Sequence, residues 1–136
     1  MKLQILFRTF LIALFSICII SITGCNKDED EPPAREKFFG TYNVNENCSF
    51  GNDNYTVTIT ASSASEDAVV ISNFYNIGVA VRANVSSSGT ELNYNDTQDG
   101  INFSGSGSIS GNTLTLIFTA SQGGATDNCT ATAIKQ

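Results

Sequence analysis

The most reactive side chains in this sequence are those of four cysteines, Cys18, Cys25, Cys48 and Cys129. A cysteine can act as a nucleophile, bind a metal ion, accept a covalent modification or form a disulfide. The sequence contains no histidine, so His-based metal sites and Ser-His-Asp or Cys-His catalysis are excluded. The chemistry of each cysteine therefore depends on the part of the chain in which it lies.

Cys25 follows a stretch with the parts of a secretory signal. Lys2 and Arg8 make the start basic, and an apolar run rich in Leu, Ile and Phe extends from Phe10 to Ile22. A transmembrane helix needs roughly 20 apolar residues, and this run is shorter. We expect an export signal; an uncleaved membrane anchor is the alternative.

The run ends in Ile22-Thr23-Gly24-Cys25, which resembles the lipobox of bacterial lipoproteins. In that family the cysteine thiol is alkylated with diacylglycerol, the chain is cut before the cysteine, and the new amine is acylated. The resemblance implies a cleaved signal peptide at residues 1–24 and a membrane anchor of acyl chains such as palmitate on Cys25. Two or more acyl chains hold a protein stably on a bilayer.

Residues 25–37 combine a charge run with the pair Pro32-Pro33 and have no apolar periodicity, so we expect a solvated, disordered tether. Its segment Lys27-Asp28-Glu29-Asp30-Glu31 resembles the acidic signal that exports some Gram-negative lipoproteins to the outer face of the outer membrane. Position 26 is Asn, not the Asp of an inner-membrane retention signal. The resemblance implies an outer-membrane lipoprotein displayed on the cell surface. A plain spacer, or the periplasmic face, is the alternative.

Acidic residues dominate the charge of the remaining chain. The whole sequence has 7 Lys and Arg against 13 Asp and Glu, and Lys2 and Arg8 are lost with the signal. No basic stripe is present to attract phosphates, so we expect no nucleic-acid partner. Residues 38–136 are enough for one small domain with one core.

Cys48 and Cys129 are the cysteines that remain once Cys18 leaves with the signal and Cys25 is acylated. Two cysteines in an exported domain most often form a disulfide. We predict a Cys48–Cys129 disulfide without redox function, because catalytic pairs are normally closer in sequence. A catalytic thiol is the alternative, and it would have no histidine as its base.

Short runs of alternating apolar and polar residues follow Phe38, separated by Gly, Asn, Asp and Ser. Eight runs lie near 42–48, 55–61, 68–75, 79–85, 92–94, 101–109, 114–118 and 129–133, and the third has an ambiguous phase. Short connections favour antiparallel neighbours. We predict an all-β fold, an antiparallel eight-stranded up-and-down barrel over 38–136, with a two-sheet β-sandwich as the alternative.

The registers implied by the turns favour a closed barrel. A turn at Gly111-Asn112 sets Gly105 opposite Phe118, and a turn at Gly123-Gly124 sets Phe118 opposite Cys129. Glycines then face bulky side chains, as the interior of a small barrel requires. The disulfide would join the end of the first strand to the start of the last. None of these pairings places a charged residue inside.

The segment Phe39-Gly40-Thr41-Tyr42 resembles the opening of lipocalin-like and fatty-acid-binding barrels, which carry Gly-x-Trp there; this chain has Tyr42 in place of the Trp. The segment from Phe103 to Leu114 is similar to small lipocalin-like lipoproteins of unknown function. The resemblance covers residues 38–136 and implies a lipocalin-like barrel more than an activity.

Six side chains share the inward phase and could face a ligand: Tyr42, Glu46, Tyr55, Tyr94, Phe103 and Phe118. Ligand pockets combine apolar walls with a few polar points, and Glu46, near one barrel mouth, would be the polar anchor. The simpler interpretation, which the sequence favours, is that the aromatic residues form the core and Glu46 lies at a solvated rim. We expect no metal or cofactor, because Asp96-Thr97-Gln98-Asp99-Gly100 lacks the ligand set of a calcium loop and suits a hairpin turn.

We expect no enzymatic activity. One function class that stays open is a lipid-anchored interaction or structural module with a filled barrel, whose partner would be an extracellular protein. The other is a lipocalin-like carrier that binds a small apolar ligand inside the barrel. A filled or hollow interior separates the two.

Overall fold

The computed structural model describes residues 32–136, so the expectations for the signal peptide, for Cys25 and for the acidic run up to Glu31 lie outside the described residues. A short 3-10 helix, η1 (Ala34–Phe38), precedes eight strands. These are β1 (Gly40–Cys48), β2 (Gly51–Ala61), β3 (Ala68–Phe74), β4 (Val79–Val85), β5 (Glu91–Gln98), β6 (Ile101–Ser110), β7 (Thr113–Gln122) and β8 (Ala125–Lys135). From residue 32 onward, the chain contains no helix with the length and hydrophobicity needed to cross a bilayer.

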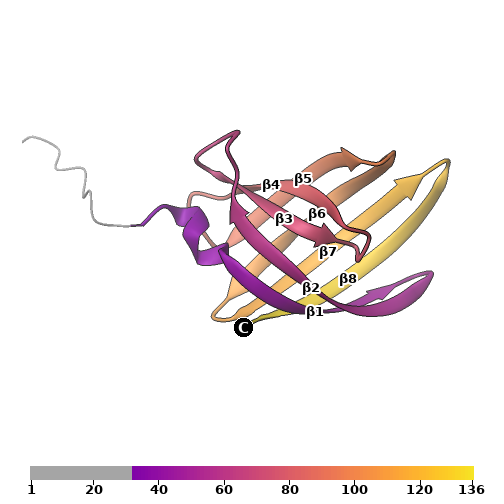
Figure 1. The fold of residues 1–136 in the computed structure, drawn as a ribbon, viewed down its shortest axis with the longest axis horizontal. Helices are drawn as coiled ribbons and strands as arrows, with labels where there is room; N and C mark the ends of the chain where they lie inside the picture. Colours follow the sequence, from indigo (N-terminus) through magenta and orange to yellow (C-terminus); the bar gives the residue numbers. More distant parts are fainter. Residues whose placement is uncertain (1–31) are drawn as a thin grey trace, which may run out of the picture. The chain divides into compact units, whose positions relative to one another are not determined.

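Each strand pairs antiparallel with the next, and β8 pairs with β1, so the sheet closes on itself (Figure 1). The closing ladder sets Val44 opposite Ala133 and Cys48 opposite Cys129. This confirms the predicted up-and-down barrel and excludes the β-sandwich, which would leave β1 and β8 unpaired.

Two of the tight turns are formed by residues with a left-handed backbone conformation. Asp99 and Gly100 have φ of 51° and 79°, and Gly123 and Gly124 have φ of 60° and 88°. Two-residue hairpin turns with both central residues at positive φ match the right-handed twist of paired strands. The segment Asp96–Gly100 is therefore the end of β5 and a hairpin turn, as the sequence indicates.

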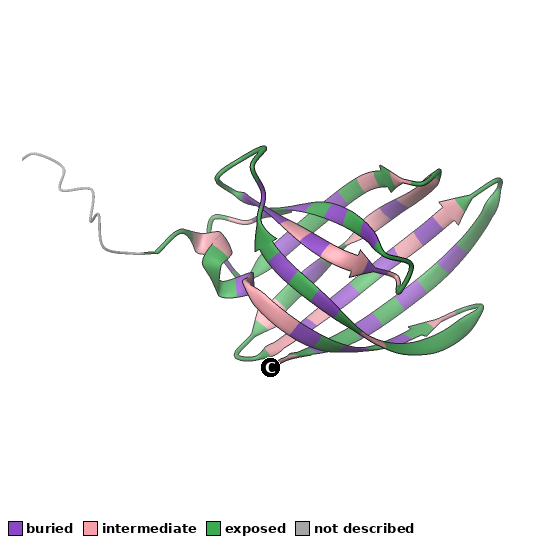
Figure 2. Ribbon diagram, in the orientation of Figure 1, coloured by how far each residue is buried: buried purple, intermediate pink, exposed green. Residues whose placement is uncertain are grey.

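Alternating burial along the strands builds the core inside the barrel (Figure 2). In β4 every second residue from Val79 to Val85 is buried and the residues between them are exposed. Gly105 lies opposite Phe118, as predicted, and a Cβ atom at Gly105 would lie only 2.6 Å from that of Phe118. The interior is therefore close-packed along β6 and β7.

The ambiguous phase of the third run has a structural cause in β3. The register with β4 shifts between Ser72 and Phe74, and the intervening Asn73 has φ of 61°. Such a bulge adds one residue and reverses the alternation. Ile71 and Phe74 both face the core as a result, although they are three residues apart.

The barrel has two ends (Figure 1). The "disulfide mouth" is the end that carries the β1–β2, β3–β4, β5–β6 and β7–β8 turns, and the "η1 end" carries η1 and the remaining connections. The closed sheet, its core and the disulfide all lie within the compact unit Pro32–Gln136. Because a compact unit with its own core can in principle fold alone, we expect residues 32–136 to fold without the preceding segment.

The η1 end differs from the tether expected up to residue 37. Arg35 Nη1 donates hydrogen bonds to three carbonyl oxygens of the β2–β3 connection, at 2.8 to 3.2 Å, those of Ser62, Ser65 and Ala68. Phe38 is fully buried in the core. The barrel unit therefore begins before residue 38, because Arg35 and Phe38 join the preceding helical turn to it.

Candidate functional site

The disulfide between Cys48 and Cys129 is present, as predicted, and joins β1 to β8. The two Cα atoms lie 4.1 Å apart, although the residues are 81 positions apart in sequence. Backbone contacts surround the bridge, since the Ser49 N–H donates to the Asn128 carbonyl at 3.0 Å. Neither sulfur is a free thiol, so the bridge serves as a structural link at this mouth.

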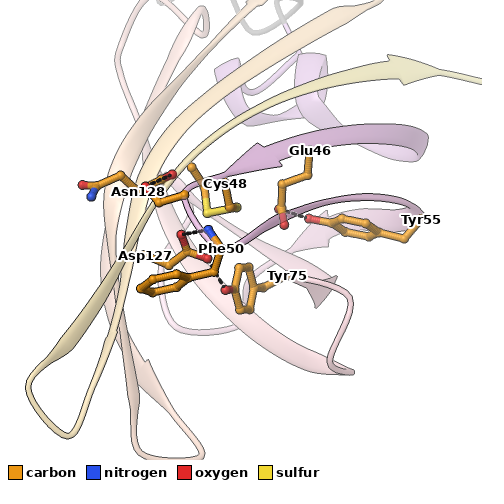
Figure 3. The surroundings of a disulfide bond; sticks show 9 residues. Glu46, Cys48, Phe50, Tyr55, Tyr75, Asp127 and Asn128 are labelled. Carbon is orange, nitrogen blue, oxygen red and sulfur yellow. Dashed lines mark hydrogen bonds between the residues drawn. A yellow bond between two sulfur atoms is a disulfide. The ribbon is translucent and has the colours of Figure 1, made fainter.

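Glu46 lies two residues before Cys48 and points into the barrel (Figure 3). Its side chain is only 4% exposed, and its Oε2 accepts a hydrogen bond of 2.5 Å from the Tyr55 hydroxyl. Burial raises the pKa of Glu46, the Tyr55 hydrogen bond lowers it in part, and the charges of Asp53 and Asp127 raise it further. The inward orientation follows the phase that Glu46 shares with Tyr42 and Val44, and the favoured expectation of a solvated rim is wrong.

Asp127 is a second buried carboxylate, and the sequence pattern missed it. Its side chain is only 4% exposed, because Asp127 lies two residues before Cys129 and therefore faces the barrel interior as Cys129 does. Its oxygens accept hydrogen bonds from the Phe50 N–H at 3.2 Å and from the Tyr75 hydroxyl at 2.7 Å. The predicted registers placed no charged residue inside, but the same ladder continued by one more inward pair sets Asp127 opposite Ala120 and buries it.

Asp127 links two turns that are far apart in sequence (Figure 3). Phe50 lies in the β1–β2 turn, and Tyr75 follows the end of β3. Burial, and then the hydrogen bond to Asp127, raises the pKa of Tyr75 to about 12. The Tyr75 hydroxyl therefore stays protonated and remains a donor to Asp127 near neutral pH.

Tyr94 contributes a buried hydroxyl group to the same part of the barrel interior. The side chain is 5% exposed, and its oxygen has no hydrogen bond to any described residue. Burial, and then the negative charge of Glu46, raises the pKa of Tyr94. The Tyr94 ring packs edge-on against Phe74, with centroids 5.5 Å apart.

The six predicted ligand-facing residues divide between the two ends of the barrel. Glu46 and Tyr55 are hydrogen-bonded to each other, and Tyr94, Phe103 and Phe118 all pack around Phe74. Tyr42 lies at the η1 end, where its hydroxyl donates to the Phe38 carbonyl at 2.9 Å. The structure therefore assembles five of the six at or below the disulfide mouth and separates Tyr42 from them.

Glu46, Cys48 and Cys129 bring one carboxylate oxygen and two sulfurs within 4.8 Å of one another. The two sulfurs are bonded to each other, so neither can become the thiolate that binds zinc or other soft metals. One carboxylate remains as an ordinary ligand, and this cluster does not fit a metal ion.

Fold and site together define a small closed antiparallel barrel with a disulfide and a layer of buried carboxylates and tyrosines at one mouth. No protein family and no curated protein matches the sequence. Among solved structures, the chain is similar to one from Bacteroides fragilis NCTC 9343, described as "a putative outer membrane protein", with 20% sequence identity and a TM-score of 0.50. The match covers 76% of this chain and 53% of that chain, so this chain spans about half of its length. The likeness shows a common fold.

Proposed function

We propose that this protein is a lipid-anchored barrel of the outer membrane, displayed on the cell surface, that acts as a non-enzymatic interaction or structural module. The lipobox-like ending at Cys25 supports the anchor, and the acidic run after it supports surface display. The outer-membrane description of the Bacteroides fragilis structure agrees with this location.

The packing of the barrel interior is the observation that carries the proposal. The Phe74 ring lies with its centroid 4.8 to 5.5 Å from those of three other rings, Tyr94, Phe103 and Phe118. An eight-stranded barrel holds either its own side chains or one small ligand. Because aromatic side chains occupy the apolar part of this interior, we assign the contacts with protein partners to the outer surface and the turns.

Removal of the acylated thiol tests the anchor. In cells fed labelled palmitate, the Cys25→Ser protein should accumulate as unprocessed precursor without label, because serine offers no thiol for alkylation. Cys18→Ser is the matched control, since Cys18 lies within the signal and should leave labelling intact. Normal labelling of the Cys25→Ser protein would refute the lipid anchor.

A search for bound lipid distinguishes the interaction or structural module from a lipocalin-like carrier. Residues 32–136, which lack Cys25, should be purified from cells and extracted with organic solvent for mass spectrometry. We expect no stoichiometric lipid and no saturable binding of a fluorescent fatty acid. Stoichiometric lipid would show that the interior opens, and would favour the carrier.

A further inference from the structure

We propose that the disulfide mouth binds a small molecule bearing a primary ammonium group, held between the carboxylate of Glu46 and the hydroxyl of Tyr94. The site is a polar layer beside the close-packed apolar interior. It goes beyond the proposed surface role and does not depend on the lipid anchor.

The mouth holds buried negative groups without a described cation beside them. Glu46 and Asp127 are each 4% exposed, and burying a carboxylate is costly unless it is paired or hydrogen-bonded. Three of the four basic side chains within residues 32–136 bind carbonyl oxygens at the η1 end: Arg35, Lys37 and Lys135. The fourth, Arg82, is exposed on β4. Charge complementarity at the mouth therefore favours a positive ligand.

The Tyr94 hydroxyl is the independent sign of a ligand. The Tyr94 side chain is only 5% exposed, and its hydroxyl oxygen has no hydrogen-bond partner among the described residues. Buried polar groups in folded proteins are nearly always hydrogen-bonded, and an exception calls for a specific explanation. The ladder pairs Tyr94–Gly105, Gly105–Phe118 and Phe118–Cys129 connect Tyr94 across the sheet to the disulfide. Glu46 lies two residues before the other cysteine of that bridge, and both side chains are buried in the barrel interior. A donor bound there would satisfy the Tyr94 oxygen.

The available acceptors suit a primary ammonium group, which has three N–H donors and no acceptor. The Tyr55 hydroxyl uses Oε2 of Glu46, so Oε1 can accept a hydrogen bond from a ligand. Aromatic rings form the apolar side of the mouth, since the Tyr75 centroid lies 5.9 Å from that of Phe103, and aromatic faces attract cations. Calcium instead takes 6 to 8 oxygen ligands, and neutral tyrosine hydroxyls would have to supply several of them.

Two turns meet beside Asp127 at the disulfide mouth (Figure 3). Asp127 holds them through one hydrogen bond from the Phe50 N–H and one from the Tyr75 hydroxyl. The Phe50 side chain is 74% exposed and therefore packs little against the barrel.

Nuclear magnetic resonance of ring-labelled tyrosine tests the site in residues 32–136, the unit that we expect to fold alone. The four tyrosines give four probes, and Tyr42, at the η1 end, is an internal control. Titration with n-propylammonium chloride should shift the Tyr55 and Tyr94 signals and leave Tyr42 unchanged. Sodium chloride at equal ionic strength should shift neither.

Near-isosteric variants test the two ligand-binding groups. Glu46→Gln should weaken n-propylammonium binding by about tenfold or more, because it removes a charge-assisted hydrogen bond. Tyr94→Phe should weaken it by roughly threefold to tenfold, while the Tm without ligand stays equal or rises, since an unsatisfied group is removed. Glu91→Gln, an exposed site on β5, should leave the affinity unchanged.

Four results would overturn the proposal. Equal shifts with n-propanol would make the mouth an apolar site, and tighter binding of calcium chloride would make it a metal site. Absence of any shift with n-propylammonium, or wild-type affinity in both the Glu46→Gln and Tyr94→Phe proteins, would remove the site altogether. None of these results bears on palmitate labelling of Cys25, so failure of the site and failure of the anchor are distinguishable.

Discussion

Glu46 and Asp127 face the interior because each lies two residues from a cysteine of the disulfide on its own strand. Side chains two residues apart on a strand share a face, so any residue at these positions is buried beside the bridge. Each carboxylate accepts a hydrogen bond from a tyrosine, Tyr55 in one case and Tyr75 in the other. These hydrogen bonds allow two acidic side chains to remain inside a small barrel.

Replacement of Glu46 by glutamine should change how stability depends on pH. The raised pKa of Glu46 means that the folded protein keeps this proton to a higher pH than the unfolded chain does. The free energy of unfolding should therefore fall as the pH rises from the ordinary value of 4.5 through the folded pKa. Glu46→Gln should remove this decline and raise the urea midpoint at pH 7.5.

Urea unfolding at intervals between pH 4 and pH 8 measures this effect. Glu91→Gln is the matched control, because Glu91 is exposed and its substitution should leave the pH profile as in the wild type. A wild-type protein that gains stability over this interval, relative to Glu46→Gln, would contradict the buried, proton-retaining carboxylate.

At the scale of strands, the sequence predicts those strands along which apolar and polar residues alternate without a break. The burial of β4 and the pairing of Gly105 with Phe118 follow from local pattern and turn position. The phase of β3 does not, because the bulge at Asn73 depends on how β3 meets β4. The helical turn Ala34–Phe38 is held to the barrel by hydrogen bonds from Arg35 to residues about 30 positions away, such as Ser65. A local sequence pattern carries no information about contacts between such distant residues.

In the candidate site, too, some features follow from the local sequence pattern and others depend on contacts between distant strands. The position of Glu46 was predictable from its phase with Cys48, and Asp127 could have been found by extending the phase of Cys129 back by two residues. The unpartnered hydroxyl of Tyr94 could not, because it depends on which side chains from other strands reach it. Sequence periodicity gives the face of a side chain and not its partners.

Removal of the disulfide should destabilise the barrel without dissolving it. Replacing Cys48 and Cys129 together by alanine should lower the free energy of unfolding by about 4–5 kcal/mol in the chain-entropy treatment, given the long loop that the bridge closes. The hydrogen bonds between β1 and β8 remain, so far-ultraviolet circular dichroism should keep its β signature. Urea unfolding measures the loss.

Reduced wild-type protein is the control for this double substitution. It should unfold at nearly the same urea concentration as the alanine variant, because both lack the same cross-link. If reduction leaves the midpoint of the wild type unchanged, the bridge does not stabilise the closure between β1 and β8.

At the scale of the whole molecule, the described chain enters the barrel at the η1 end, and the buried carboxylates lie at the other end. The proposed lipid anchor on Cys25 would join the barrel through this entry point. The proposed ammonium site then lies at the end opposite the point of attachment, where soluble ligands would reach it.

The acidic run after Cys25 should determine the side of the outer membrane on which the barrel lies. Changing Asp28, Glu29, Asp30 and Glu31 together to alanine should abolish degradation by protease added to intact cells, because it removes the proposed export signal. The control makes the same change of charge on the barrel, at four exposed acids: Glu36, Glu66, Asp67 and Glu91. Unchanged protease access in the first variant would reduce the run to a spacer.

β1 runs from the η1 end to the disulfide mouth, where Cys48 joins it to β8. Tension between a membrane-held N-terminus and a ligand held at the mouth would act along this strand. The hydrogen bonds that join β1 to β2 and β8 lie across the strand direction, so the force loads them together in shear and does not peel them one by one. The covalent bridge stops β1 from sliding past β8 at its far end. Under such tension the closed sheet would therefore be loaded in shear along both ladders of β1.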